Sequence, residues 1–220
     1  MFDDKLDEPP KLVFTFDDGD SSIYDVAFQL MKDYGFRGTN FINSETMGQP
    51  NKMTWEQIRE MELLYSWETG CHTLKHENLA QMSIEEAIAN IKKDKHNLEE
   101  QGLCPVSFAL PKGQAPNNLY PTLQDLFQNV RGSSDFAMYN PINRFALGYL
   151  PYQSNWDADL IKARILRGIA NNEDLIIIGF HRFNSVEDIY HDSCTTQTFR
   201  EILDFVQSRD LEVIPLRCAF

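Results

Sequence analysis

The sequence predicts a single α/β domain built around a largely parallel sheet. Short apolar runs typical of buried strands alternate with segments whose apolar residues recur at helical spacing. The composition keeps one character over all 220 residues, and neither an internal repeat nor a low-complexity segment interrupts it. This length fits one domain with a substantial core. We therefore assign residues 1–10 to a lead-in and residues 11–220 to the domain.

The first elements follow from their residue patterns. Residues 11–16 are an apolar run and predict a buried strand. Apolar side chains in residues 23–31 recur at helical spacing until Tyr34-Gly35 closes the predicted helix. Residues 38–42 predict a second, short strand. The chain thus begins with the strand–helix–strand order of a parallel sheet.

Two helices are predicted in the next part of the chain. Thr54 is a suitable N-cap for a helix that runs to residue 65, and residues 68–72 read as a strand end or loop. Ser83 and Glu86 have the spacing of a capping box, which predicts a long helix over residues 83–100.

The remaining elements continue the alternation. A strand is expected over 106–110 and is followed by the breaker-rich stretch 111–116. The least regular part, residues 133–155, is interpreted as an insertion or long loop. The last elements are helices over 157–170 and 195–208 and strands over 175–180 and 212–216. Chemistry in such a fold is expected at the carboxyl ends of the strands.

The charge and composition of the chain limit the kinds of binding partner that it can have. The formal net charge of −13 argues against nucleic acid or an anionic membrane surface. No apolar run approaches the length that spans a membrane. The first ten residues are acidic and lack the apolar core of a signal peptide, so a cytoplasmic protein and a mature exported domain both remain open.

Two adjacent carboxylates, Asp17 and Asp18, stand where the first strand breaks into a loop. Adjacent aspartates repel unless a cation or a proton lies between them, so one can hold a metal while the other moves a proton. The alternative is an ordinary turn, because Asp-Asp-Gly is also a common turn sequence.

Three histidines complete the candidate site. His72 and His76 are four residues apart, a spacing that places both imidazoles on one side. Alone they read as surface histidines, but with Asp18 they form an open three-ligand site for Zn²⁺ or a similar ion. His181 ends the apolar run 175–180 and is either a packed core histidine or a proton donor presented to a cleft.

The chain resembles the polysaccharide deacetylase family, carbohydrate esterase family four. Four segments match the family's motifs in the correct order, and the likeness covers nearly the whole chain. They are Thr15-Phe16-Asp17-Asp18-Gly19, then Glu68-Thr-Gly-Cys-His72-Thr-Leu-Lys-His76, then Phe108-Ala-Leu-Pro111-Lys-Gly113, and the apolar run that ends in His181.

The resemblance implies a distorted (β/α)7 barrel that removes acetyl groups from N-acetylated sugars. It implies that Asp18, His72 and His76 hold the metal, most simply Zn²⁺, with Co²⁺ or Ni²⁺ as alternatives. Asp17 would then be the general base and His181 the general acid. The family also favours an extracytoplasmic or cell-envelope location.

Further roles follow from the same resemblance. The loop at Pro111-Lys112 would supply an oxyanion-stabilising backbone N–H. Ile178 and Phe180 would line a pocket for the acetyl methyl group, with a place in the core as the alternative. Trp156 would stack on a sugar, with a buried packing tryptophan as the alternative. The third motif lacks the arginine that orients the base aspartate in many members. Arg144 is a candidate replacement, with a surface salt bridge as its alternative role.

Several functions stay open at this stage. The leading one is a de-N-acetylase acting on a GlcNAc-containing glycan such as peptidoglycan, chitin or an exopolysaccharide. The alternatives are an O-acetyl xylan esterase and a non-catalytic carbohydrate-binding member of the fold. A two-histidine, one-carboxylate iron oxygenase is disfavoured, because that chemistry requires no second aspartate.

Overall fold

Seven parallel strands form one curled sheet in the computed structural model, which describes residues 9–185 and 191–220. The strand order is β5-β4-β3-β2-β1-β7-β6, and every strand pair in this sheet is parallel. The strands are β1 Lys11–Asp17, β2 Thr39–Ile42, β3 Glu68–Cys71, β4 Ser107–Ala109, β5 Asn129–Arg131, β6 Leu150–Pro151 and β7 Leu175–Phe180. A separate small sheet pairs β8 (Arg182–Phe183) with β9 (Ser193–Cys194).

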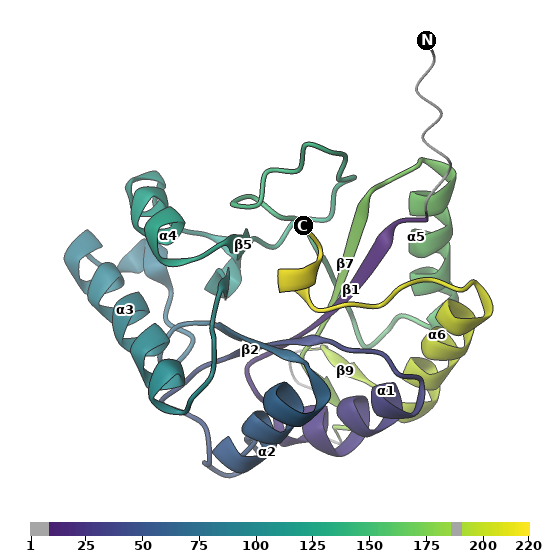
Figure 1. Cartoon of the computed structure of the whole chain (residues 1–220), viewed down its shortest axis with the longest axis horizontal. Coiled ribbons are helices and arrows are strands. Elements are labelled where there is room, and N and C mark those ends of the chain that lie inside the picture. Colours follow the sequence, from purple (N-terminus) through teal and green to yellow (C-terminus); the bar gives the residue numbers. More distant parts are fainter. Residues whose placement is uncertain (1–8, 186–190) are drawn as a thin grey trace.

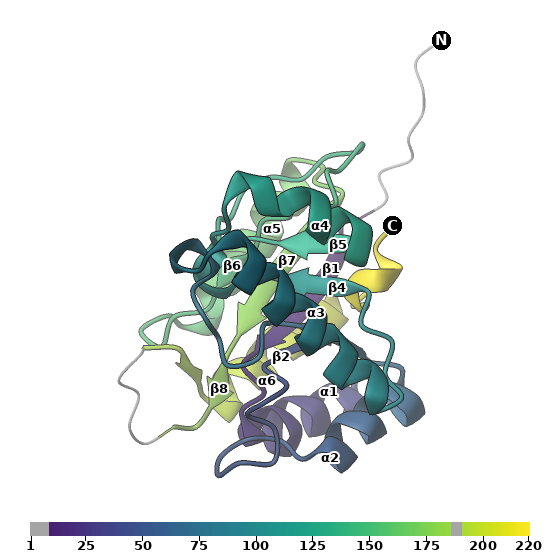
Figure 2. The same cartoon turned by 90° about the vertical axis from the view of Figure 1, so that its left-hand side faces the viewer.

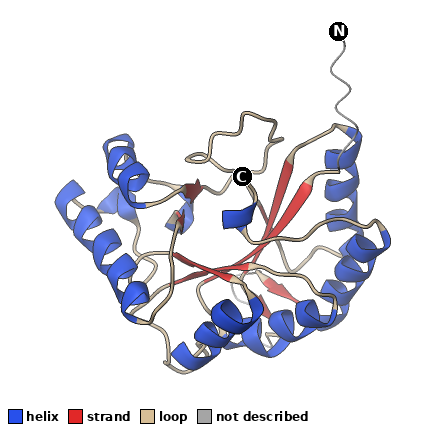
Figure 3. Ribbon diagram, viewed as in Figure 1, coloured by secondary structure: helices blue, strands red, loops and turns tan. Residues whose placement is uncertain are grey.

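The helices lie on the outside of this curl, as Figures 1 and 3 show. They are α1 Gln29–Asp33, α2 Trp55–Arg59, α3 Ile84–Glu100, α4 Tyr120–Leu126, α5 Ala158–Ala170 and α6 Thr196–Ser208, with π-helical turns at Ile23–Phe28 and Glu60–Leu64. Figure 2 shows α3 in front of β4. The C-terminal turn Leu216–Cys218 lies within the open curve of the sheet (Figure 1). The expected distorted (β/α) barrel is therefore present as a curled half-barrel.

Two apolar layers pack on the two faces of the sheet. Even-numbered residues of β7 join the helix-facing core, where the ring centroids of Phe180 and Phe199 are 5.0 Å apart. Odd-numbered residues of β7 join the inner core with Val13 and Leu216. This alternation follows from the strand geometry, which points successive side chains to opposite faces.

Local signals predicted most element boundaries. Thr54 and Ser83 both form capping boxes at the starts of α2 and α3. Helix α4 and strands β5 and β6 were not predicted. The predicted strand over 212–216 is wrong: the structure has one bridge between Leu12 and Val213, then the turn at Leu216. Within the described ranges, no helix is both long and apolar enough to cross a membrane.

Candidate metal and catalytic site

The candidate residues gather at the carboxyl ends of neighbouring strands. Asp17 is the last residue of β1, and Asp18 follows it; His72 follows β3, and His181 follows β7. Strands β1, β2 and β3 are adjacent in the sheet, and β7 pairs with β1 on the other side. The parallel sheet thereby brings together residues from three distant parts of the sequence.

Asp18, His72 and His76 form a cluster with the dimensions of a cation site. One ligand atom from each lies within 4.8 Å of the others. The Asp18 Oδ1 atom is 3.7 Å from His72 Nε2 and 3.9 Å from His76 Nε2. In the described part of the chain, this buried oxygen has no hydrogen-bond partner. Two imidazole nitrogens and a carboxylate oxygen suit Zn²⁺ or a similar divalent ion, so these residues fit such a group.

The backbone at this cluster has left-handed conformations. Asp18 has φ 68° and Gly19 has φ 65°, so the Asp-Asp-Gly segment is a turn as well as part of the cluster. His76 also lies at φ 64°. Such conformations are uncommon for residues with a side chain, and at functional sites they are maintained by the surrounding structure. The turn and the site are therefore not competing interpretations of the aspartate pair.

His72 is oriented with one nitrogen free. Its Nδ1 atom lies 2.8 Å from the carbonyl oxygen of Ala109 in β4, which accepts the Nδ1–H and leaves Nε2 unprotonated toward Asp18. Burial lowers the pKa of His72, although Asp17 and Asp18 oppose this effect. The imidazole is therefore neutral near pH 7 and suited to bind a metal.

A buried carboxylate, Asp94 of α3, supports the His72 backbone. Its Oδ2 accepts the N–H of His72 at 3.1 Å and its Oδ1 accepts the N–H of Ser44 at 3.2 Å. Asp94 stands in a run of lysines that suggests a solvated face, and we did not single it out from the sequence. Its helical spacing from the buried residues Ile91 and Leu98 was the available signal.

Asp94 gives a pH-dependent stability prediction. Burial raises its pKa to about 6 from the ordinary 3.8 and outweighs the lowering effect of the hydrogen bonds that the carboxylate accepts. Between these pH values the folded protein binds more protons than the unfolded chain, so this group's contribution to the free energy of unfolding falls as pH rises. In metal-free protein, we expect the stability difference between wild type and Asp94→Asn to fall by about 3 kcal/mol from pH 3.5 to pH 6.5. Urea denaturation at each pH measures it; parallel curves for the two proteins would contradict the assignment.

Asp17 is paired with a buried arginine from the far edge of the sheet. Arg131, the last residue of β5, donates from Nη2 to Asp17 Oδ2 at 2.6 Å, and both side chains are buried. Burial by itself would raise the pKa of Asp17. Arg131, followed by His72 and His181, outweighs that effect and holds the pKa below its usual value. Asp17 is therefore ionised near neutral pH and able to accept a proton.

This pair corrects the prediction for Arg144. Arg144 Nε donates to Asn129 Oδ1 at 3.0 Å, and its guanidinium lies 4.5 Å from the ring centroid of Phe220. Arg131 and not Arg144 contacts Asp17. Sequence reasoning missed it because β5 has only three residues, too short for a periodic signal.

His181 lies beside the same carboxylate. Its Nε2 atom is 3.8 Å from Asp17 Oδ2, and its side chain is 20% exposed. Its Nδ1 is buried and makes no hydrogen bond to any residue that the structure describes. His181 is thus presented at the strand end and is not a histidine packed within the core.

The proposed acetyl pocket residues face the wrong way. Ile178 and Phe180 belong to the helix-facing core and are fully buried there. Asp17 and Val13 alternate onto the inner face of β1, as do Ile177 and Gly179 on the paired β7. The prediction that Ile178 and Phe180 line the site is therefore wrong.

The three remaining candidate residues lie outside the cluster of carboxylates and histidines, and the structure does not test their predicted roles. Lys112, with φ 57°, and the buried Pro111 lie on the loop that follows β4, close in sequence to Ala109. A backbone N–H of Lys112 as an oxyanion donor stays a prediction. Trp156 is half-buried against the helix-facing core, and its carbonyl accepts the Tyr152 hydroxyl at 2.8 Å. Its role in stacking on a sugar likewise stays a prediction.

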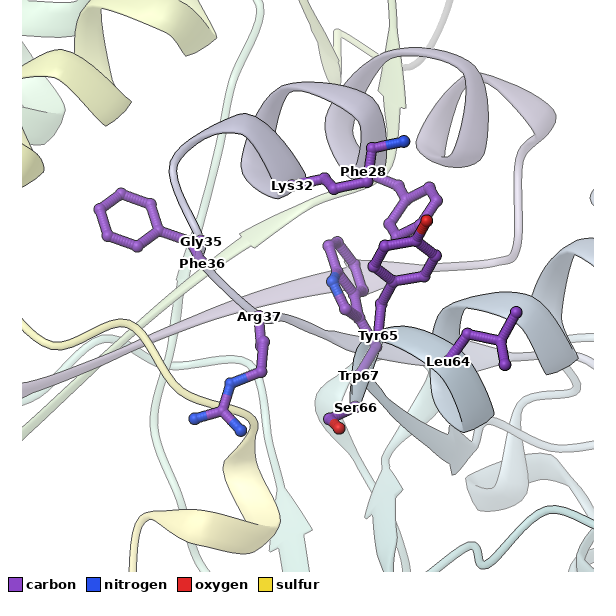
Figure 4. Close-up of a pocket in the computed structure, with 9 residues that line it drawn as sticks. All are labelled: Phe28, Lys32, Gly35, Phe36, Arg37, Leu64, Tyr65, Ser66 and Trp67. Carbon is purple, nitrogen blue, oxygen red and sulfur yellow. The ribbon is translucent and has the colours of Figure 1, made fainter.

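A hollow lies at the opposite ends of the strands from the candidate site. Figure 4 shows it between Phe28 and Lys32 on one side and Tyr65 and Trp67 on the other. Its segments precede β2 and β3, whereas the candidate site follows them. The Lys32 ammonium is 5.4 Å from the Tyr65 ring centroid, so the one lysine that lines this hollow already makes a cation–π contact within the protein.

Fold and site together define a half-barrel α/β protein in which a cluster suited to a cation adjoins an ionised carboxylate. The chain belongs to the polysaccharide deacetylase family, whose family model matches residues 4–127. The match ends before β5, so Arg131 and His181 lie beyond it.

Known proteins support this placement. The Bacillus subtilis (strain 168) protein YxkH, itself assigned to the polysaccharide deacetylases, is 28% identical over 108 residues. That alignment covers 48% of this chain and 38% of YxkH, so the matched part is well under half of that relative's length.

Solved structures of the same family share the fold. A family 4 acetyl xylan esterase from Clostridium thermocellum, in complex with a cobalt ion, has a TM-score of 0.68 at 20% identity, covering 95% of this chain and 89% of that one. A mutant of the peptidoglycan deacetylase PdaC from Bacillus subtilis has a TM-score of 0.62 at 19% identity, covering 97% and 91%. At these identities the likeness shows the fold alone.

Proposed function

We propose that this chain is a metal-dependent hydrolase that removes N-acetyl groups from a GlcNAc-containing polysaccharide or oligosaccharide. The observation that carries the proposal is the contact between a candidate base and a candidate acid: His181 Nε2 is 3.8 Å from Asp17 Oδ2. Both lie at the same strand ends as Asp18, His72 and His76. Amide cleavage needs both groups, because water must lose a proton and the departing amine must gain one.

The roles divide by environment. Asp18, His72 and His76 would hold the divalent ion, which polarises the acetyl carbonyl and lowers the pKa of water when it is bound. Asp17 is kept ionised by Arg131 and would accept the proton of the attacking water. His181 is partly exposed and would donate a proton to the sugar nitrogen as the C–N bond breaks.

The experiment that tests this proposal is metal removal followed by reconstitution. Protein stripped with EDTA is expected to release no acetate from chitin oligomers or peptidoglycan, and one equivalent of Zn²⁺, Co²⁺ or Ni²⁺ is expected to restore release. Acetylated xylan is the parallel substrate. Acetate from xylan alone would indicate an O-acetyl esterase, because an alkoxide leaves with less help from an acid than an amine does. No acetate from any substrate with any of these ions would overturn the proposed reaction.

A further inference from the structure

The Arg131 guanidinium is enclosed by aromatic rings. Its central carbon is 3.7 Å from the ring centroid of Tyr149 and 5.0 Å from that of Phe41, both within cation–π distance. Arg131 is 1% exposed, and its one hydrogen bond of good geometry runs from Nη2 to Asp17, since Nε and Nη1 have no such bond to a described residue. Hydrogen bonds alone therefore do not fix this buried side chain, and the two ring faces supply the missing contacts.

Two strand glycines make room for these rings. A Cβ atom at Gly70 of β3 would lie 2.6 Å from Phe41 Cε1, and one at Gly179 of β7 would lie 2.4 Å from Tyr149 Cε2. Real Cβ contacts do not reach these distances. Glycine weakens a strand interior, so close approach of a neighbouring group is a common reason for its presence there. The inner face of the sheet is thus shaped around the aromatic pair Phe41 and Tyr149.

We propose that Tyr149, together with Phe41, is a positioning residue for the deacetylation: its ring fixes the Arg131 guanidinium that in turn orients Asp17. This inference rests on the function proposed above. Tyr149 comes from the irregular segment between β5 and β6, where its N–H donates to the carbonyl of Ser134 at 3.1 Å. Burial raises the pKa of Tyr149 and outweighs the opposing effect of the Arg131 guanidinium, so the phenol stays neutral. The segment therefore serves the catalytic base as well as covering the sheet edge.

Comparing Tyr149→Phe with Tyr149→Leu tests whether the ring or the hydroxyl of Tyr149 positions Arg131. The phenylalanine keeps the ring face and is expected to retain kcat within about threefold. The leucine removes it and is expected to lower kcat roughly 10- to 100-fold, with KM and bound metal little changed. A loss as large for phenylalanine as for leucine would assign the work to the hydroxyl and overturn the proposal. If Tyr149→Leu does not fold, Phe41→Leu removes the other ring face that contacts Arg131, and the same loss of kcat is expected.

A double-mutant cycle with Arg131→Met separates positioning from general packing. If Tyr149 acts through Arg131, Tyr149→Leu lowers kcat little further in the Arg131→Met background. An equal loss in both backgrounds would overturn the proposal. Urea midpoints of the same four proteins give a second readout, and the shift caused by Tyr149→Leu should shrink by about half without Arg131. A wild type that releases no acetate counts against the proposed function, and the urea cycle then still decides whether Tyr149 holds Arg131.

Discussion

Asp17→Asn is expected to lower turnover roughly 100- to 10,000-fold while the protein keeps its bound metal. The amide is nearly isosteric with the carboxylate but cannot accept the proton of water. Asp18, His72 and His76 are unchanged in this variant, so the candidate ligand set remains complete. Acetate release under saturating substrate measures the loss, and elemental analysis of the purified variant measures the metal.

Two matched control variants show which aspartate binds the metal and which accepts the proton. Asp18→Asn is expected to lose the metal, because Asp18 Oδ1 is the carboxylate atom next to both histidine nitrogens. Asp204→Asn, on the distant helix α6, changes an exposed carboxylate that accepts the Tyr34 hydroxyl, and it should leave turnover unchanged. Loss of metal from Asp17→Asn with retention by Asp18→Asn would mean that the two roles are exchanged.

The site residues that could be predicted are those with short local signals. Asp17 and Asp18 stand at the end of an apolar strand, and His72 and His76 are four positions apart, so these residues can be identified from the sequence alone. Parallel strand order then predicts that strand ends meet at one edge. Gly179 lies on β7 and His181 follows the strand two residues later, so the same period of two already excludes Ile178 from their face.

The residues that could not be predicted act over long sequence separations. Arg131 contacts Asp17 across 114 positions, from a strand too short to be recognised. Tyr149 lies in a segment without periodicity, and Asp94 stands among lysines on a helix. For Arg131 and Tyr149 the contacts depend on tertiary packing that no local pattern encodes, whereas for Asp94 the only local signal is its helical spacing from Ile91 and Leu98. The question of what replaces the third-motif arginine is thus answered by a residue in a different strand.

Arg131→Met is expected to destabilise the protein by about 3–5 kcal/mol, because it leaves Asp17 buried without its counter-charge. Burial would then raise the pKa of Asp17, so the acid limb of the pH profile of kcat/KM should move to higher pH. Urea denaturation measures the first effect and acetate release across pH measures the second. Arg131→Lys covers the case in which methionine prevents folding: the charge remains, but the planar group that stacks on Tyr149 is lost, and turnover should be intermediate.

The control for this variant is Arg59→Met, which removes a partly exposed arginine paired with Glu56 on α2. Surface pairs of this kind contribute about 0–1 kcal/mol, so stability and turnover should stay near wild type. The two arginines therefore separate the effect of a lost guanidinium from the effect of an uncompensated buried carboxylate. An Arg131→Met protein with the urea midpoint and pH profile of wild type would mean that the ion pair neither stabilises the fold nor keeps Asp17 ionised, and another group would have to do so.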